Sequence, residues 1–192
     1  MSNERKMIYL CLAHMSEDGL VQKYVKEAFD TNWVVPLGPN VNAFEDNLKQ
    51  FVGKDQQGRE KEVVALSAGT AAVHLALIAC GVKPGDEVCV QSFTFCASSH
   101  PITYLGATPV FIDSERGTWN MDPELLEKAI LDRIEKTGKK PKAIIPVALY
   151  GMPYDCERIM AVAEKYDIPV IEDAAEGFGS KFKGQMLGTF GK

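Results

Sequence analysis

Apolar residues recur at two different spacings along the chain. In residues 17–30, Leu20, Tyr24 and Phe29 are among the apolar residues that repeat at helical intervals, which predicts a helix. Residues 41–52 predict a second helix, and the polar stretch "GKDQQGREKE" follows it. The first 62 residues therefore form a predicted N-terminal helical segment.

From residue 63 onward, short apolar runs alternate with helical stretches. The predicted strands are "VVALS", "EVCVQS", "PVFIDS", "KAIIPVAL" and "IPVI". The predicted helices between them are "TAAVHLALIACG", "FCASSHPITYLG", "PELLEKAILDRIEKTG" and "DCERIMAVAEKY". This alternation indicates right-handed crossovers and an α/β fold over residues 63–192, with a mostly parallel sheet covered by helices on both faces.

The end of the chain carries turn signals but little apolar alternation. In "GSKFKGQMLGTFGK" no closing helix or strand is predicted. An α/β sheet without its final elements would keep an unpaired edge and an uncovered face. We therefore expect the chain to be part of something longer.

Composition narrows the functional classes. The chain has 192 residues, 46% of them hydrophobic, and a formal net charge of -5, which argues against a nucleic-acid binder. No apolar run approaches the length that spans a bilayer, so a soluble protein is expected. The five cysteines include no CxxC pair, which favours a reduced cytoplasm, and the three histidines form no metal-binding motif.

Asp173 in "VIEDAAEGFG" is the strongest candidate for a functional residue. It follows a predicted core strand, and ligands of parallel sheets collect beyond the carboxyl ends of the strands. An unpartnered buried carboxylate would cost several kcal/mol, so a cation should meet it. That cation could be a Lys or Arg, a helix N-terminus or a protonated ligand nitrogen.

Two weaker candidates lie at neighbouring strand ends. "LSAGTAAVHLAL" places Gly69 and Thr70 at a strand-to-helix turn, where free backbone N–H groups can bind phosphate, although Ser67 or Thr70 could merely cap the helix. "QSFTFCAS" places Phe93 and Phe95 past the next strand, where an aromatic ring could belong to the core or stack on a planar ligand. A phosphate, a planar ring and a protonated ring nitrogen together describe pyridoxal phosphate.

The sequence resembles the DegT/DnrJ/EryC1/StrS family of nucleotide-sugar aminotransferases, which have the aspartate-aminotransferase fold. The shared motifs include "NWVVPLGPNVNAFE", "SAGTAAVHLAL", "SFTFCAS", "GATPVFID", "IEDAAEGFGS" and "LGTFG", in the family's order. The closest likeness is to enzymes that aminate UDP-4-keto-6-deoxy-N-acetylhexosamines.

The resemblance implies roles for five residues. Thr70 and Ala71 would hold the phosphate of pyridoxal phosphate, Phe95 would stack on its ring, and Asp173 would bind the ring nitrogen. Glu176 stands where many relatives have His or Gln beside the ring hydroxyl. No metal site is implied.

The family's Schiff-base lysine lies downstream of the "GTFG" match, beyond the end of this sequence. The resemblance thus covers the N-terminal half of such an enzyme, which would transfer an amino group from glutamate to a 4-keto sugar nucleotide as a homodimer. We expect negligible transamination by these residues alone. The alternatives are a pyridoxal-phosphate sugar dehydratase and a non-catalytic fragment that binds the cofactor or a protein partner.

Overall fold

The computed structural model describes residues 17–54, 58 and 60–191. Contacts divide the chain into two compact units, Met1–Phe51 and Val52–Lys192. The division predicted from the sequence, after residue 62, stays a prediction.

Both predicted helices of the N-terminal segment are present. The first is α1 (Leu20–Asp30), which begins where the Asp18 carboxylate accepts a hydrogen bond from the Leu20 N–H at 3.0 Å. The second is α2 (Pro39–Val52). Neither helix has a fully buried residue, and the Phe29 side chain is 67% exposed.

A parallel sheet forms the centre of the second unit. Its strands are β1 (Glu87–Gln91), β2 (Thr108–Ile112) and β3 (Ala143–Ile145), in the order β2-β1-β3. This parallel pairing confirms the predicted α/β fold.

The predicted strand at residues 168–171 lies along the outer edge of β3. Parallel bridges join Ile144 to Val170 and Val147 to Asp173. The ladder between the two bridges is interrupted, because Pro146 has no backbone N–H to donate. Residues 168–173 therefore follow the sheet as two separate bridges rather than as a continuous strand.

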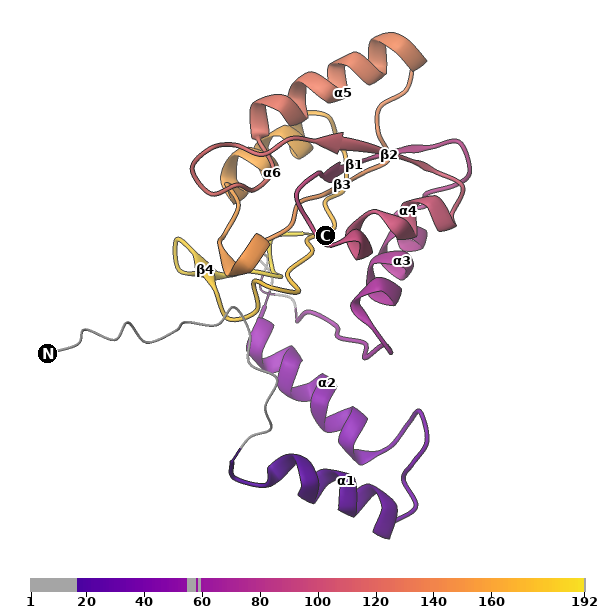
Figure 1. The fold of residues 1–192 in the computed structure, drawn as a ribbon, viewed down its shortest axis with the longest axis vertical. Helices are drawn as coiled ribbons and strands as arrows, with labels where there is room; N and C mark the ends of the chain where they lie inside the picture. Colours follow the sequence, from indigo (N-terminus) through magenta and orange to yellow (C-terminus); the bar gives the residue numbers. More distant parts are fainter. Residues whose placement is uncertain (1–16, 55–57, 59, 192) are drawn as a thin grey trace, which may run out of the picture. The chain divides into compact units, whose positions relative to one another are not determined.

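Helices cover both faces of the sheet, as predicted. Figure 1 shows α5 (Pro123–Thr137) and α6 (Cys156–Lys165) on one side of the strands, and α3 (Gly69–Ala79) and α4 (His100–Tyr104) on the other. Alternate residues of β1 point to opposite faces, so Cys89 packs in the core beneath α5 and α6, whereas Val88 and Val90 pack beneath α3 and α4.

Two predicted elements differ from the structure. Residues 63–67 form no strand, and Val64 is 68% exposed. The helix predicted in "FCASSHPITYLG" is split into the 3-10 turn η1 (Cys96–Ser98) and the short α4. Pro101 causes this break, since it cannot donate a backbone hydrogen bond to the preceding turn.

The last described residues contain a small hairpin where only turns were predicted. Its strands are β4 (Lys181–Phe182) and β5 (Gln185–Met186), and they pair antiparallel. The 3-10 turn η2 (Leu149–Gly151) follows the end of β3. No described helix is long and apolar enough to span a membrane.

Candidate functional site

Asp173 lies at the carboxyl end of the parallel sheet, where the sequence predicted it. Its N–H donates to the Pro146 carbonyl at 3.0 Å, and its own carbonyl accepts from the Ala148 N–H at 3.2 Å. The main chain of Asp173 is thus part of the sheet ladder, and its half-buried side chain extends from a fixed point.

The Asp173 carboxylate has neutral hydrogen-bond donors. The Ser98 hydroxyl donates to Oδ2 at 2.7 Å, and the Ala175 N–H donates to Oδ1 at 3.2 Å. Among residues 17–54, 58 and 60–191, no Lys or Arg forms an ion pair with Asp173. The first of the cations expected from the sequence, a Lys or Arg, is therefore absent from this part of the structure.

The segment that carries Phe95 is tied to Asp173. Phe95 precedes η1 in extended conformation, and its side chain is 72% exposed. The Thr94 and Ser98 hydroxyls lie 3.0 Å apart, and Ser98 reaches Asp173. Sequence reasoning missed both hydroxyls, although they occur in the "FTFCAS" motif that drew attention to Phe95.

Thr70 and Ala71 lie in the first turn of α3, which starts after the extended residue Ala68. No side chain caps this helix, so the alternative that Ser67 or Thr70 serves as the cap is wrong. A Cβ built on Gly69 would meet no atom within 4 Å, so there is open space beside this residue. The helix also contacts η1, the turn that carries Ser98.

The Glu176 carboxylate binds a different group from those that the Asp173 carboxylate binds. Its carboxylate accepts a hydrogen bond from the backbone N–H of Tyr150 in η2. The next residue must be glycine, because a Cβ on Gly177 would lie 2.6 Å from the Ala148 Cβ. The turn after Asp173 is thereby packed closely on the loop after β3.

The structure therefore brings Asp173 together with the segment that carries Phe95. The helix α3, which begins with Thr70 and Ala71 in its first turn, contacts η1 in this segment. In the same part of the chain, no recorded hydrogen bond joins Thr70 or Ala71 to Asp173. This is an edge with an anchored carboxylate, an exposed aromatic ring and an uncapped helix N-terminus.

Comparison with known proteins identifies the family of the chain. The DegT/DnrJ/EryC1/StrS aminotransferase family matches residues 16–192. The chain belongs to this family. The match confirms the resemblance carried by the motifs.

Individual relatives support the family assignment. EpsN of Bacillus subtilis strain 168 is 50% identical over 187 residues, which are 97% of this chain and 46% of EpsN. GDP-perosamine synthase of Escherichia coli O157:H7 is 40% identical over 96% of this chain and 47% of its own length. The crystal structure of NtdA from Bacillus subtilis with bound cofactor PMP matches with a TM-score of 0.74 and 31% identity, over 86% of this chain and 35% of NtdA. The chain spans less than half the length of each.

Two buried amides behind the site were missed in the sequence. In this DegT/DnrJ/EryC1/StrS chain, Gln91 and Asn120 are both fully buried. The Gln91 carboxamide oxygen accepts from the Met121 N–H at 2.8 Å and the Val147 N–H at 3.3 Å, and its nitrogen donates to the Phe93 carbonyl at 2.8 Å. Only the apolar setting of Gln91 in "EVCVQS" could have signalled it, because a buried amide needs partners.

Asn120 extends the same network. Its oxygen accepts from the Leu149 N–H at 3.0 Å, and its nitrogen donates to the Met152 carbonyl at 2.9 Å. The two amides are 3.4 Å apart, from the Gln91 nitrogen to the Asn120 oxygen. Together they fix the loops that follow β1 and β3.

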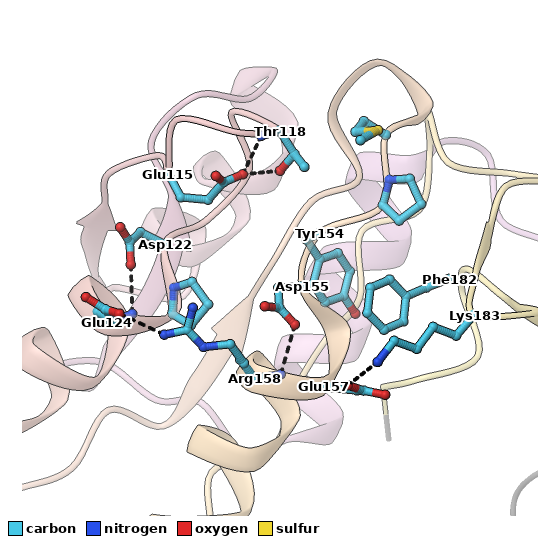
Figure 2. Close-up of a pocket in the computed structure, with 13 residues that line it drawn as sticks. Glu115, Thr118, Asp122, Glu124, Tyr154, Asp155, Glu157, Arg158, Phe182 and Lys183 are labelled. Atoms are coloured by element: carbon cyan, nitrogen blue, oxygen red, sulfur yellow. Dashed lines mark hydrogen bonds and ion pairs between the residues drawn. The ribbon is translucent and has the colours of Figure 1, made fainter.

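A cavity of about 710 Å³ lies elsewhere and is shown in Figure 2. Most of its charged side chains are occupied by each other or by helix starts. Arg158 pairs with Glu124 at 3.0 Å, and Lys183 pairs with Glu157 at 2.6 Å. Asp155 caps α6 by accepting from the Arg158 N–H. This cavity contains none of the site residues predicted from the sequence.

Proposed function

We propose that this chain forms part of an enzyme that uses pyridoxal phosphate to transfer an amino group to a sugar nucleotide. Three findings support the proposal: the family assignment, a relative named GDP-perosamine synthase and a similar structure with bound PMP. As the finer form of the proposal, the acceptor is a UDP-linked 4-keto-6-deoxy sugar, the donor is glutamate and the whole enzyme is a homodimer. The motifs carry this finer form by resemblance.

The observation that carries the proposal is the position of the Asp173 carboxylate. It is anchored in the sheet at the carboxyl edge, and its recorded partners are the neutral donors Ser98 and Ala175. A carboxylate held in this way can accept a proton-bearing ring nitrogen as its cation. We therefore propose the third possibility raised by the sequence, a protonated ligand nitrogen, as the cation that meets Asp173.

The residues present fit pyridoxal phosphate. The start of α3, which no side chain caps, suits a phosphate, for which Thr70 would supply its hydroxyl. The Ala71 N–H donates to the Ala68 carbonyl at 3.0 Å, so Ala71 would bind the phosphate by sharing this donor. Phe95 presents an exposed ring for stacking, and Asp173 would hold the proton on the ring nitrogen. When bound, this cofactor supplies an electron sink for the amino carbon of the substrate.

Glu176 is proposed to act beside the ring hydroxyl, as its motif position implies. Its carboxylate already holds the Tyr150 N–H, so it also keeps η2 close to the turn after Asp173. The Schiff-base lysine is proposed to lie downstream of the "GTFG" match. We therefore propose that residues 1–192 alone bind the cofactor but do not turn over.

Binding of pyridoxamine 5′-phosphate tests the proposal. This compound has the ring and the phosphate but no aldehyde, so surface lysines cannot capture it. Equilibrium dialysis with the purified chain should show saturable binding. Asp173→Asn should weaken it by at least about tenfold, because a hydrogen bond to a charged group contributes on the order of 1.5–3 kcal/mol.

The matched control is Asp155→Asn, which changes another anchored aspartate, outside the predicted site. It should leave the affinity for pyridoxamine phosphate unchanged. Equal binding by Asp173→Asn and the unmodified chain would contradict the proposal. A robust turnover with glutamate and a 4-keto sugar nucleotide would contradict the proposed inactivity of residues 1–192.

A further inference from the structure

Three aromatic side chains from separate segments meet near the carboxyl edge of the sheet. They are Phe93 after β1, Trp119 in the loop before α5, and Tyr150 in η2. The ring centroid of Phe93 lies 6.4 Å from that of Trp119 and 6.3 Å from that of Tyr150, and both pairs pack edge to face. Phe93 therefore stands at the centre of the group.

These rings stay largely exposed although they contact one another. Phe93 is 45% exposed, Trp119 is 61% exposed and Tyr150 is 59% exposed. With Thr118, Leu149 and Met152 they line a cavity of about 490 Å³, which we call the aromatic cavity. Its volume lies within the range of small-molecule sites, and its lining is mostly apolar, as in such sites.

The backbone holds two of the rings outward at a conformational cost. Trp119 and Tyr150 have φ angles of 63° and 53°, in the left-handed region that bulky residues rarely adopt. The Trp119 N–H donates to the Glu115 carbonyl at 3.2 Å, and the Tyr150 N–H donates to the Glu176 carboxylate. Strained residues that are fixed in this way occur most often at functional sites.

The buried amides fix the main chain beside the same three rings. Gln91 binds the carbonyl of Phe93, and Asn120 directly follows Trp119. Asn120 also binds the N–H of Leu149 and the carbonyl of Met152, on either side of Tyr150. The aromatic cavity is thus organised before any ligand arrives.

A second cavity of about 700 Å³ adjoins the aromatic cavity and shares Phe93 and Trp119 with it. Asp113, Ser114 and Arg116 complete its lining, and Arg116 is the one cation among these lining residues. A guanidinium binds phosphate oxygens well because its donors form a planar fork. A flat ring beside a phosphate-binding cation matches the chemistry of a nucleoside diphosphate.

We propose that the aromatic cavity binds the nucleobase of the sugar nucleotide, with the diphosphate directed to Arg116. This inference rests on the proposed function, because it assigns a place to one part of its substrate. A second copy of the chain is the competing occupant. The Arg116 side of the paired cavities favours the nucleotide, since an apolar contact between copies would need no phosphate-binding cation.

Fluorescence of Trp119 tests the inference. The chain has two tryptophans, so Trp33→Phe leaves Trp119 as the one emitter, and Trp33 belongs to the other compact unit. UDP and GDP are titrated into this variant, with ribose 5-phosphate as a control that has phosphate but no base. We expect saturable quenching by at least one nucleotide and none by ribose 5-phosphate.

Phe93→Leu in the Trp33→Phe background removes the central ring and keeps an apolar side chain. It should weaken the quenching affinity by about tenfold, as expected for loss of one aromatic partner of a base. Leu125→Ala, on an exposed part of α5, is the matched control and should leave the affinity unchanged. Pyridoxamine phosphate binding is measured on each variant.

Three results would overturn the inference. They are no nucleotide quenching, quenching that Phe93→Leu leaves unchanged, and Trp119 emission that changes with protein concentration in the absence of nucleotide. The last result would assign the aromatic cavity to a second copy. If pyridoxamine phosphate still binds, the inference fails alone; if it does not bind, the proposed function fails as well.

Discussion

The cavity in Figure 2 and the aromatic cavity share Thr118 and Met152, but their other lining residues differ in chemistry. In the first, Arg158 and Lys183 are paired with Glu124 and Glu157. In the second, large aromatic side chains face outward on strained backbone. The cavity with more charged side chains therefore has fewer groups available to bind a ligand.

The comparison shows that the partners of a side chain indicate function better than the size of the hollow beside it. Charged groups that satisfy each other or cap helices are explained by stability alone. Exposed rings held by buried amides have no such explanation, because burying them would release free energy. Changes in the two regions should consequently have very different effects.

The largest expected effect is on Gln91, which supports the loops of the aromatic cavity. Gln91→Leu removes the acceptor of the buried Met121 and Val147 N–H groups. At about 1–3 kcal/mol for each unsatisfied buried group, the free energy of unfolding should fall by about 3 kcal/mol. Urea unfolding followed by circular dichroism measures the change, and a loss below about 1 kcal/mol would contradict the supporting role.

Cysteine reactivity provides a second contrast, between the turn η1 and the hydrophobic core. Cys96 in η1 is exposed, whereas Cys156, at the start of α6, is buried. Burial raises the pKa of both the Cys156 and the Cys89 thiol to about 12. Iodoacetamide at mildly alkaline pH, followed by peptide mass mapping, should label Cys96 in the folded chain and label Cys89 and Cys156 only after denaturation.

The same shifts give a pH dependence of stability. Because the folded-state pKa of these two thiols is raised, they ionise first in the unfolded state, and their contribution is fully present below pH 9.0. Stability should then fall as the pH rises from 9.0 toward about 12. Cys89→Ala should flatten this decline in urea unfolding series, and an unchanged slope would contradict the assignment.

Ser98→Ala tests how the Asp173 carboxylate is oriented. The change removes the 2.7 Å hydrogen bond to Oδ2 and leaves the sheet ladder intact. Loss of one such bond is worth about 1 kcal/mol, so binding of pyridoxamine phosphate should weaken by about fivefold. Ser99→Ala is the control, because the Ser99 hydroxyl donates to the Cys96 carbonyl instead. Equal effects of the two changes on the affinity for pyridoxamine phosphate would contradict a role for Ser98 in the site.

The smallest effect is expected in the Figure 2 cavity. Arg158→Gln breaks the pair with Glu124, in which both side chains are more than half exposed. Exposed pairs contribute about 0–1 kcal/mol, so urea unfolding should shift by less than about 1 kcal/mol. A larger loss would show that this cavity depends on its ion pairs, as the aromatic cavity depends on its buried amides.

Sequence patterns predicted the elements whose determinants are local. The alternation of Val88, Cys89 and Val90 between two cores follows from the period of a strand, so the covered parallel sheet could be predicted. The strand predicted at residues 63–67 does not form. The apolar pattern could not show this, because a strand needs a neighbouring strand that the pattern does not identify. Pro101 and Pro146 were visible in the sequence, yet their effects depend on the hydrogen bonds around them.

The candidate site divides in the same way. Asp173 and Phe95 could be predicted as site residues because each follows a predicted strand in a motif. Ser98 and Asn120 could not be assigned, since their partners lie 75 and 29 residues away in the chain. Their importance arises from tertiary contacts, which the order of residues does not reveal.

The hydrogen bonds of the Asp173 main chain to Pro146 and Ala148 have a consequence for how such a protein could diversify. The main chain of Asp173 moves only if the sheet moves, whereas Trp119 and Tyr150 lie in loops outside the sheet. Sequence changes would then be tolerated more easily in these loops than at the ladder position of Asp173. The position of Asp173 is therefore expected to vary less among related sequences than the loops around it.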